Sequence, residues 1–343
     1  MSRRIFLYTP WCEQCLSYDA KAIEKIAIEN SLEPIITYNK KRKIKWDCTF
    51  VPINKLINQI TENDIFFCFE RFPIKIIKQI KEKAKAMYLM INYEYYESDY
   101  VQYYGLFDVV YCKSKIAIEG CINDGLKNYF YMPWILWNHP IKEVKPIEKK
   151  IKVLFNGGTG GYKDRRNLGA IINLLKNYPD DDIAVTIKLT KKMRSWTKKI
   201  FKENIKFLKS DNRISLIQDN MDKNEYIDFL NNFDINLAPS KYEGFGLTIL
   251  EGLHSRLATI TLNESPMNEI VSNNKNGYCM PTIKIDKIRN QIIFDVEESI
   301  FLDYFTKLVK NPEDIYKMKK ETSYLLEKNI EQFNSHFKQK FNE

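Results

Sequence analysis

The chain has 343 residues, of which 44% are hydrophobic and 28% charged, and its formal net charge is +9. These values are typical of a globular protein and leave room for two domains, each with its own core. Both halves share the positive excess, with 23 basic against 18 acidic residues in 1–150 and 30 against 26 in 151–343. Because the sequence shows neither a basic arm nor a nucleic-acid motif, we predict no nucleic-acid partner, while peripheral contact with a membrane surface stays open.

The sequence also indicates a cellular location. No apolar run approaches the roughly 20 residues that span a bilayer, and the short apolar stretch before Pro10 favours a first β-strand over a signal peptide. The seven cysteines are odd in number and scattered, without the spacing of a disulfide framework. We therefore expect a cytoplasmic protein, with membrane association as an alternative.

In the first half of the chain, short apolar runs alternate with helical patterns. We predict helices over 20–29 and 74–85. The predicted strands are residues 5–8, 34–38, 64–70, 86–92, 107–112 and 129–132. Strands separated by helices favour a parallel, doubly wound sheet.

Around residues 134–150, prolines and charges interrupt this pattern, as expected of an interdomain linker. A second strand–helix series follows. Its predicted strands are residues 151–156, 184–189, 214–218, 235–238 and 259–262. From Pro312 onward the chain is charged, with apolar residues near helical spacing, which predicts terminal helices.

The segment Ser-Lys-Tyr-Glu-Gly-Phe-Gly-Leu-Thr-Ile-Leu-Glu at 240–251 is the most specific motif. It predicts a strand end, a tight turn at Gly244 and Gly246, and a helix whose first N–H groups attract anions. Glu251 follows Glu243 by eight residues, about two helical turns, where a carboxylate can accept hydrogen bonds from a sugar diol. The segment therefore predicts a site for a phosphate and a sugar.

A glycine-rich loop follows the first strand of the second series and reads Asn-Gly-Gly-Thr-Gly-Gly-Tyr-Lys-Asp-Arg-Arg-Asn at 156–167. Its glycines allow close backbone approach, and three cations, Lys163, Arg165 and Arg166, stand just before a predicted helix. Fixed cations and open amide groups suit a diphosphate. We predict that Gly158 and Thr159 contact the ligand with these cations.

These motifs resemble those of glycosyltransferase family 4 and related GT-B enzymes, in which two glutamates stand eight residues apart around a Gly-Phe-Gly turn. Asn268-Glu269-Ile270-Val271 and the following Asn276-Gly277-Tyr278 resemble the closing segment of that family. The resemblance covers about a hundred residues. The residues that match the motif itself are Ser240, Glu243, Gly244, Phe245, Gly246, Leu247, Leu250 and Glu251.

The resemblance implies an α/β fold of the GT-B type, with two Rossmann-like doubly wound domains facing a cleft and a C-terminal helix that crosses back to the first domain. The expected boundaries are 1–140 for an acceptor domain, 141–150 for the linker and 151–311 for a donor domain. Residues 312–343 are expected to form the helices that pack back on the first domain.

The resemblance also implies an activity, hexosyl transfer from a nucleotide-diphosphate sugar to a glycan, glycoconjugate or protein acceptor. It implies retention of configuration and no metal or other cofactor. Glu251 would hold the ribose diol, and Glu243 would stand beside the donor sugar as a catalytic residue. Phe245, Leu247 and the two glycines of the turn would meet phosphate or sugar oxygens through their amides.

The first domain departs from the family pattern, which often places a histidine near the transferred sugar. The three histidines, at positions 139, 254 and 336, fall elsewhere. Glu94, beyond the strand at 86–92, is the alternative catalytic residue, since side chains at the carboxyl ends of parallel strands face the ligand. Because no histidine falls at the position typical of the family, one alternative function is the binding of a nucleotide-sugar without catalysis.

A second alternative comes from Cys12 and Cys15, which lie between a predicted strand and helix in the C-x-x-C spacing of a thiol-disulfide oxidoreductase. Val51-Pro52 lies at a plausible distance for the proline turn of that fold. Against it, the strand–helix alternation continues for another hundred residues, beyond the length of a thioredoxin domain.

Overall fold

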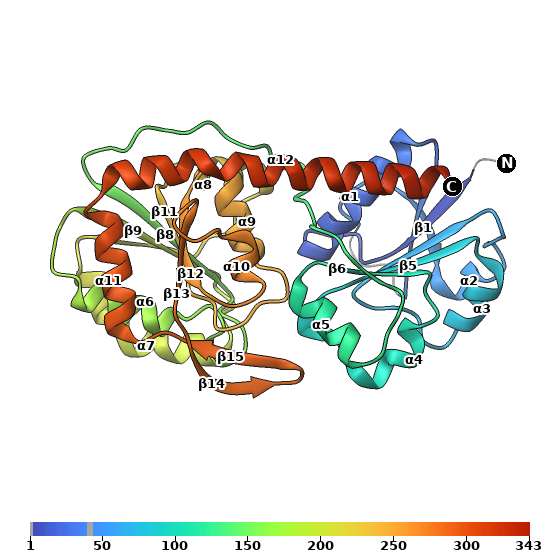
Figure 1. The fold of residues 1–343 in the computed structure, drawn as a ribbon, viewed down its shortest axis with the longest axis horizontal. Helices are drawn as coiled ribbons and strands as arrows, with labels where there is room; N and C mark the ends of the chain where they lie inside the picture. Colours follow the sequence, from blue (N-terminus) through green and yellow to red (C-terminus); the bar gives the residue numbers. More distant parts are fainter. Residues whose placement is uncertain (1–2, 40–43) are drawn as a thin grey trace. The chain divides into compact units, whose positions relative to one another are not determined.

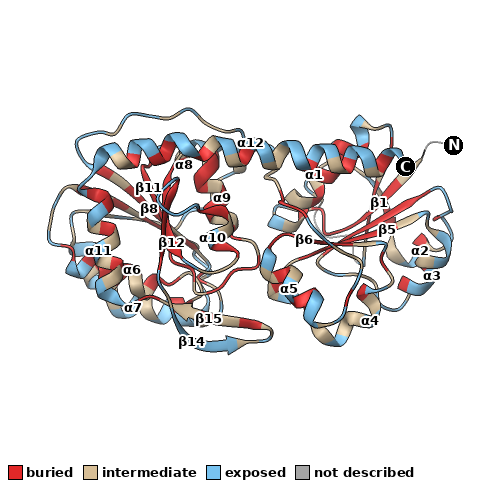
Figure 2. Ribbon diagram, viewed as in Figure 1, coloured by how far each residue is buried: buried red, intermediate tan, exposed pale blue. Residues whose placement is uncertain are grey.

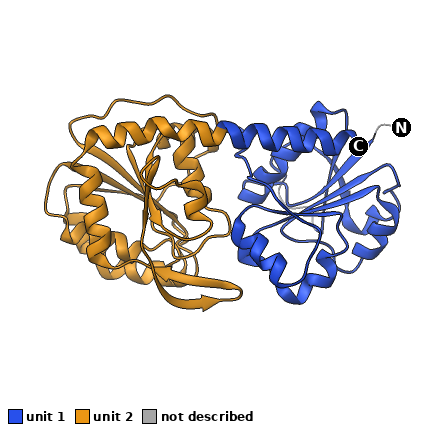
Figure 3. Cartoon of the chain, viewed as in Figure 1, with its two compact units in different colours: residues 1–138, 327–343 blue, residues 139–326 orange. Residues whose placement is uncertain are grey.

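The computed structural model describes residues 3–39 and 44–343. The chain divides into two compact units, unit 1 with residues 1–138 and 327–343 and unit 2 with residues 139–326 (Figure 3). Each unit contains a parallel sheet with its own core. In both sheets the strands are largely buried and the outer helical faces are exposed (Figure 2).

The strands of unit 1 are β1 (Arg4–Tyr8), β2 (Glu33–Tyr38), β3 (Thr49–Pro52), β4 (Ile65–Phe69), β5 (Ala86–Ile91), β6 (Val109–Cys112) and β7 (Tyr129–Tyr131). They form one parallel sheet in the order β3-β2-β1-β4-β5-β6-β7 (Figure 1). All five residues of β4 are buried, which suits a central strand covered on both faces. This order is that of a doubly wound domain.

The helices of unit 1 lie between these strands. They are α1 (Cys15–Glu29), α2 (Ile53–Leu56), α3 (Ile77–Lys83), α4 (Val101–Tyr104) and α5 (Lys115–Asn123), with 3₁₀ turns at Tyr93–Tyr95 and Ser98–Tyr100. Six of the seven strands correspond to predicted ones. The edge strand β3 was not predicted, because four residues ending in proline give almost no periodic pattern.

Unit 2 repeats the architecture with a six-stranded sheet. Its strands are β8 (Ile151–Gly158), β9 (Ile183–Leu189), β10 (Ile214–Ile217), β11 (Ile235–Ala238), β12 (Ala258–Leu262) and β13 (Gly277–Met280). They are parallel in the order β10-β9-β8-β11-β12-β13, equivalent to that of unit 1. The predicted strands are all present, and β13 is an additional one.

The helices of unit 2 are α6 (Leu168–Asn177), α7 (Ser195–Ser210), α8 (Lys223–Leu230), α9 (Leu247–His254), α10 (Met267–Ile270) and α11 (Glu298–Val309), with a 3₁₀ turn at Tyr162–Asp164. A separate antiparallel hairpin of β14 (Ile283–Ile288) and β15 (Gln291–Asp295) precedes α11. This hairpin was not predicted from the sequence, although β14 consists of isoleucines and charged residues.

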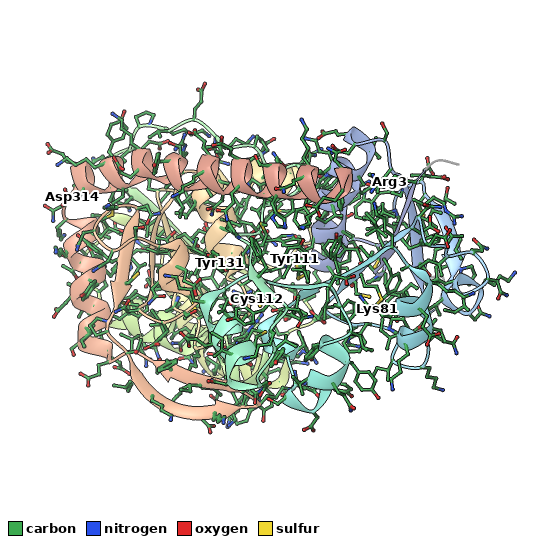
Figure 4. The ribbon with its side chains drawn as sticks, turned by 45° about the vertical axis from the view of Figure 1, so that its right-hand side comes forward. Arg3, Lys81, Tyr111, Cys112, Tyr131 and Asp314 are labelled. Carbon is green, nitrogen blue, oxygen red and sulfur yellow. The ribbon has the colours of Figure 1, made fainter. Side chains whose placement is uncertain are left out.

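The last helix, α12 (Pro312–Asn342), contributes to both units. Its C-terminal half carries Phe333, Phe337 and Phe341 at four-residue spacing, and all three are fully buried. The ring of Phe337 lies 5.0 Å from that of Tyr111, a residue labelled in Figure 4. This apolar face belongs to the core of unit 1, and the predicted return of the terminal helix to the first domain is confirmed.

Two histidines are buried side by side in unit 2. The ring centroids of His139 and His254 lie 5.2 Å apart, and Nε2 of His139 is 3.4 Å from Oγ of Ser255. Burial lowers the pKa of His139 to about 3 and that of His254 to about 4. Both rings are therefore neutral in the folded protein at physiological pH.

The two histidines should make the protein sensitive to acid. The unfolded chain takes up protons near pH 6.5 and the folded chain does not, so the free energy of unfolding falls as pH drops below 6.5. Between pH 7.5 and 5 the expected loss is about 2 kcal/mol for each histidine. Urea unfolding of wild type and His139→Gln at both pH values measures the effect. A variant that loses as much stability as wild type would contradict this assignment.

Candidate functional site

The turn between β11 and α9 contains the first predicted glutamate. Gly246 adopts a φ of +89° at the start of α9, a left-handed conformation that glycine adopts at little cost. Glu243, three residues earlier, is 4% exposed. The β11 strand, the left-handed glycine and the helix thus place a carboxylate inside unit 2, where it requires a charged partner.

Arg166 of the glycine-rich loop is that partner. Its Nη1 pairs with Oε1 of Glu243 and also donates to Oγ1 of Thr248 at 3.0 Å. Nη1 of Arg165 lies 3.5 Å from the other oxygen of Glu243. Burial acts to raise the pKa of Glu243, but the two guanidinium groups outweigh it, so the pKa is lowered and the carboxylate stays ionised.

The glycine-rich loop is fixed by contacts to α7. Gly160 has a φ of +83°, and a Cβ atom at this position would overlap the side chain of Thr197, so close packing requires a glycine here. Oγ1 of Thr197 donates to Asp164 at 2.9 Å, and the amide of Gly169 donates to the same carboxylate at 3.1 Å. These bonds give the loop a defined shape and orient Arg166.

Glu251, the second predicted glutamate, lies on the second turn of α9 and is only partly exposed. The hydroxyl of Tyr226 donates to Oε2 of Glu251 at 3.0 Å and accepts a bond of 2.6 Å from Nδ2 of Asn156. Burial raises the pKa of Glu251 to about 7, although Tyr226 and Arg166 act in the opposite direction. The two carboxylates consequently differ, because Glu243 is held ionised and Glu251 titrates near neutrality.

Arg166 connects the two glutamates. It pairs directly with Glu243, and its charge also lowers the pKa of Glu251. Lys188, at the end of β9, lies 5.8 Å above the ring of Tyr226 and adds positive charge near Glu251. No contact of Lys188, Tyr226 or Asn156 with this part of the site was predicted, because these contacts arise from tertiary proximity.

The hairpin β14–β15 supports the Glu243 turn. The side-chain amide of Gln291, which is 3% exposed, donates to the backbone carbonyl of Glu243 at 2.8 Å. Asp295 accepts from Lys241 at 2.7 Å and from Asn167 at 2.8 Å. Since Lys241 precedes the turn and Asn167 ends the glycine-rich loop, the hairpin joins both predicted ligand-binding segments.

The structure brings some predicted residues together and separates two, Lys163 and Glu94, from them. Arg165, Arg166, Glu243 and Glu251 form one cluster with the turn that holds Gly244, Phe245, Gly246 and Leu247. In the glycine-rich loop, Gly158 has a φ of +52°, and the carbonyl of Thr159 accepts the amide of Arg194 at 2.8 Å. Lys163 instead pairs with Asp286 of the hairpin and takes no direct part in the cluster.

Glu94 belongs to unit 1 and lies in the 3₁₀ turn after β5, partly exposed. The structure adds a neighbouring carboxylate, Glu70, just beyond β4. Glu70 has a φ of +64°, and Nδ2 of Asn92 donates to its side chain at 3.4 Å. Burial raises the pKa of Glu70, and the charge of Glu94 adds to the increase. Glu70 is thus an acid with a perturbed pKa at this edge of the sheet.

The two cysteines of the redox alternative lie in the loop after β1. Cys15 begins α1 and is exposed, whereas Cys12 is half-buried three residues before the helix. Val51 and Pro52 belong to the parallel edge strand β3. The loop that carries this motif therefore follows a strand of a seven-stranded parallel sheet of the Rossmann type.

Within residues 3–39 and 44–343, no group of three or more histidine, cysteine, aspartate or glutamate side chains is arranged to hold a metal ion. Among the helices of this described part of the chain, none has the length and apolar character to cross a bilayer.

Two doubly wound domains and a C-terminal helix that returns to the first of them define the GT-B fold. Residues 194–311, about a third of the chain, match the family Glycosyl transferases group 1. This match confirms the resemblance seen in the sequence; the assignment to family 4 stays a prediction. No curated protein matches the chain in sequence.

Solved structures confirm the fold over the whole chain. A glycosyltransferase from Rickettsia africae has a TM-score of 0.75 at 14% identity, covering 99% of this chain and 97% of its own. Sucrose-phosphate synthase from Thermosynechococcus elongatus has a TM-score of 0.73 at 11% identity, covering 99% of both chains. HepE from Anabaena, in complex with UDP and glucose, has a TM-score of 0.71 at 10% identity, covering 100% of this chain and 98% of its own.

Proposed function

We propose that this chain is a glycosyltransferase that moves a hexose from a nucleotide-diphosphate sugar to a hydroxyl group of a glycan, glycoconjugate or protein. The observation that carries the proposal is the ion pair of Arg166 with Glu243 in unit 2, together with the effect of the Arg166 charge on Glu251. A cation that acts on an ionised carboxylate and on one that titrates near neutrality suits a ligand that combines phosphate groups with a diol. The family match and a structural neighbour that contains UDP and glucose support this proposal.

Each group has a role that follows from its chemistry. Glu251 would accept hydrogen bonds from the ribose diol through Oε1, while Tyr226 holds Oε2. Arg165 and Arg166 would stabilise the negative charge that develops on the departing diphosphate. Glu243 would orient Arg166 and stand beside the donor sugar. Amide groups of the turn at 244–247 would complete the anion site.

The finer features of the reaction are also proposals. We expect retention of configuration and no need for a metal, since two arginines stand where the diphosphate charge would lie. Glu94 and the neighbouring Glu70 are the candidates in unit 1 for orienting an acceptor hydroxyl. The expected location is the cytoplasm. The alternative is a thiol-disulfide function of Cys12 and Cys15. The family match at 194–311 does not include these two residues and gives this alternative no support.

A thermal-shift panel tests the proposed function. Wild-type protein is heated with UDP-, GDP-, ADP- and dTDP-sugars, and at least one should raise the unfolding temperature, because a ligand that binds only the folded state stabilises it. The active donor is then incubated with acceptor sugars and release of the nucleoside diphosphate is followed. No stabilisation by any donor would count against the donor site, whereas binding without turnover would favour an inert binding protein.

A further inference from the structure

A short segment of unit 2 holds most of the chain's excess charge. Residues 191–209 contain eight basic residues and one acidic residue, a net charge of +7 in a chain whose total is +9. The net positive charge is divided nearly equally between the two halves of the chain, so a comparison of the halves does not reveal this local concentration of basic residues. All eight basic residues are exposed, and they are Lys191, Lys192, Arg194, Lys198, Lys199, Lys202, Lys206 and Lys209.

Helix α7 arranges five of these lysines as a stripe. At 3.6 residues per turn, Lys198, Lys199, Lys202, Lys206 and Lys209 fall within an arc of about 100°. Thr197 and Leu208, on the other side of the helix, are buried in unit 2. Helix α7 is therefore amphipathic, with its basic face turned to solvent.

The basic charge has little acidic compensation nearby. Lys191 lies 3.0 Å from Asp219, and Lys199 lies 3.9 Å from Glu203. More than half of each of these four side chains is exposed, so both ion pairs are weak and screened by solvent. A strongly positive field consequently remains along the helix.

Trp196 adds an apolar group at the N-terminal end of the stripe. It is 51% exposed, and with Ile200 it lines a cavity of about 540 Å³ between α6 and α7. About half of the indole surface is therefore available for contact with another surface. At a membrane interface the amphipathic ring of tryptophan is favoured.

We propose that this basic face, the eight cations of residues 191–209 together with Trp196, docks unit 2 onto an anionic lipid surface. Four to eight basic residues on an amphipathic helix suit attraction to acidic headgroups, and the indole suits insertion at the headgroup level. The lysines lie along one side of a straight helix, which matches an extended flat surface. Because the exposed face contains none of the residues assigned to the donor site, lipid binding is independent of the proposed sugar transfer.

Vesicle flotation tests the docking surface. The full-length protein is mixed with vesicles of phosphatidylcholine alone or with added phosphatidylglycerol. Wild type should float only with the anionic vesicles, and less so at high salt. The variant Lys198→Glu/Lys202→Glu/Lys206→Glu should bind at least about tenfold more weakly, and Trp196→Ala should also weaken binding. Circular dichroism checks folding, and Lys→Gln at the same positions replaces the variant if it does not fold.

A matched control separates this surface from general positive charge. Lys317→Glu/Lys320→Glu/Lys328→Glu changes the net charge equally, at exposed lysines of α12, and should float like wild type. Absence of wild-type flotation with anionic vesicles would overturn the proposal. So would equal binding of the α7 variant and wild type, or binding of a DNA duplex in place of vesicles. Donor-induced thermal stabilisation should be the same in both variants.

Discussion

Replacing Glu251 by alanine should weaken the binding of a nucleotide-sugar donor by about 100-fold. Each hydrogen bond to a charged group contributes about 1.5–3 kcal/mol, and the diol would make two such bonds to Oε1 of Glu251. A loss of about 3 kcal/mol corresponds to roughly 100-fold in Kd. Isothermal titration with the donor identified by thermal shift measures the change.

The affinity should also depend on pH in a defined direction. Since burial raises the pKa of Glu251 to about 7, the carboxylate is lost as pH falls through 7, and donor binding should weaken between pH 8 and 6. Glu251→Gln cannot titrate and should lack this dependence. Glu225→Ala removes an exposed glutamate of α8 and serves as the control. Wild-type affinity in Glu251→Ala would contradict the assigned role.

Replacing Arg166 by methionine should reduce both stability and turnover. Removing one member of a largely buried ion pair leaves Glu243 without its closest counter-charge, which costs about 3–5 kcal/mol. Loss of a group that stabilises developing negative charge lowers kcat by about 10²–10³-fold. Urea unfolding and release of nucleoside diphosphate measure the two effects.

The double variant Arg166→Met/Glu243→Gln separates the effect on stability from the effect on turnover. Because neither buried charge remains, much of the lost stability should return, whereas the turnover should not. Arg71→Met, which removes an arginine side chain that is 70% exposed, should change the free energy of unfolding by less than about 0.5 kcal/mol. If the single Arg166→Met variant keeps wild-type turnover, the arginine does not serve the diphosphate.

The core strands and the motif-bearing turn were predictable, since their signals are local. Each predicted strand of both sheets is a short segment in which apolar residues are continuous or alternate with polar ones, and the Glu243 turn carries its own glycines. The hairpin was missed although the alternation at 283–288 and the turn at Arg289 and Asn290 contain a signal. That signal is weak, because the sequence does not distinguish isoleucines that face solvent, such as Ile283 and Ile285, from isoleucines of a buried strand.

The surroundings of the carboxylates could not be predicted in the same way. Tyr226 of α8 donates to Glu251 and accepts from Asn156 of β8, and only the folded sheet brings these three residues together. Glu70 is distinguished by a left-handed backbone and by burial, neither of which is marked by its neighbours in sequence. The basic residues of α7 are visible in the sequence, but a count of charges over each half of the chain does not show that they are concentrated in one segment.

The hairpin β14–β15 limits how far the Glu243–Glu251 segment can act as a module. Gln291 holds the carbonyl of Glu243, and Asp295 ties Lys241 to Asn167, so three stretches of chain, 128 residues apart at their ends, share one set of hydrogen bonds. Grafting residues 240–251 into another parallel-sheet protein would carry the motif without the contacts that shape it. Recombination between related chains should therefore preserve this geometry only if the crossover lies before residue 156 or after residue 295.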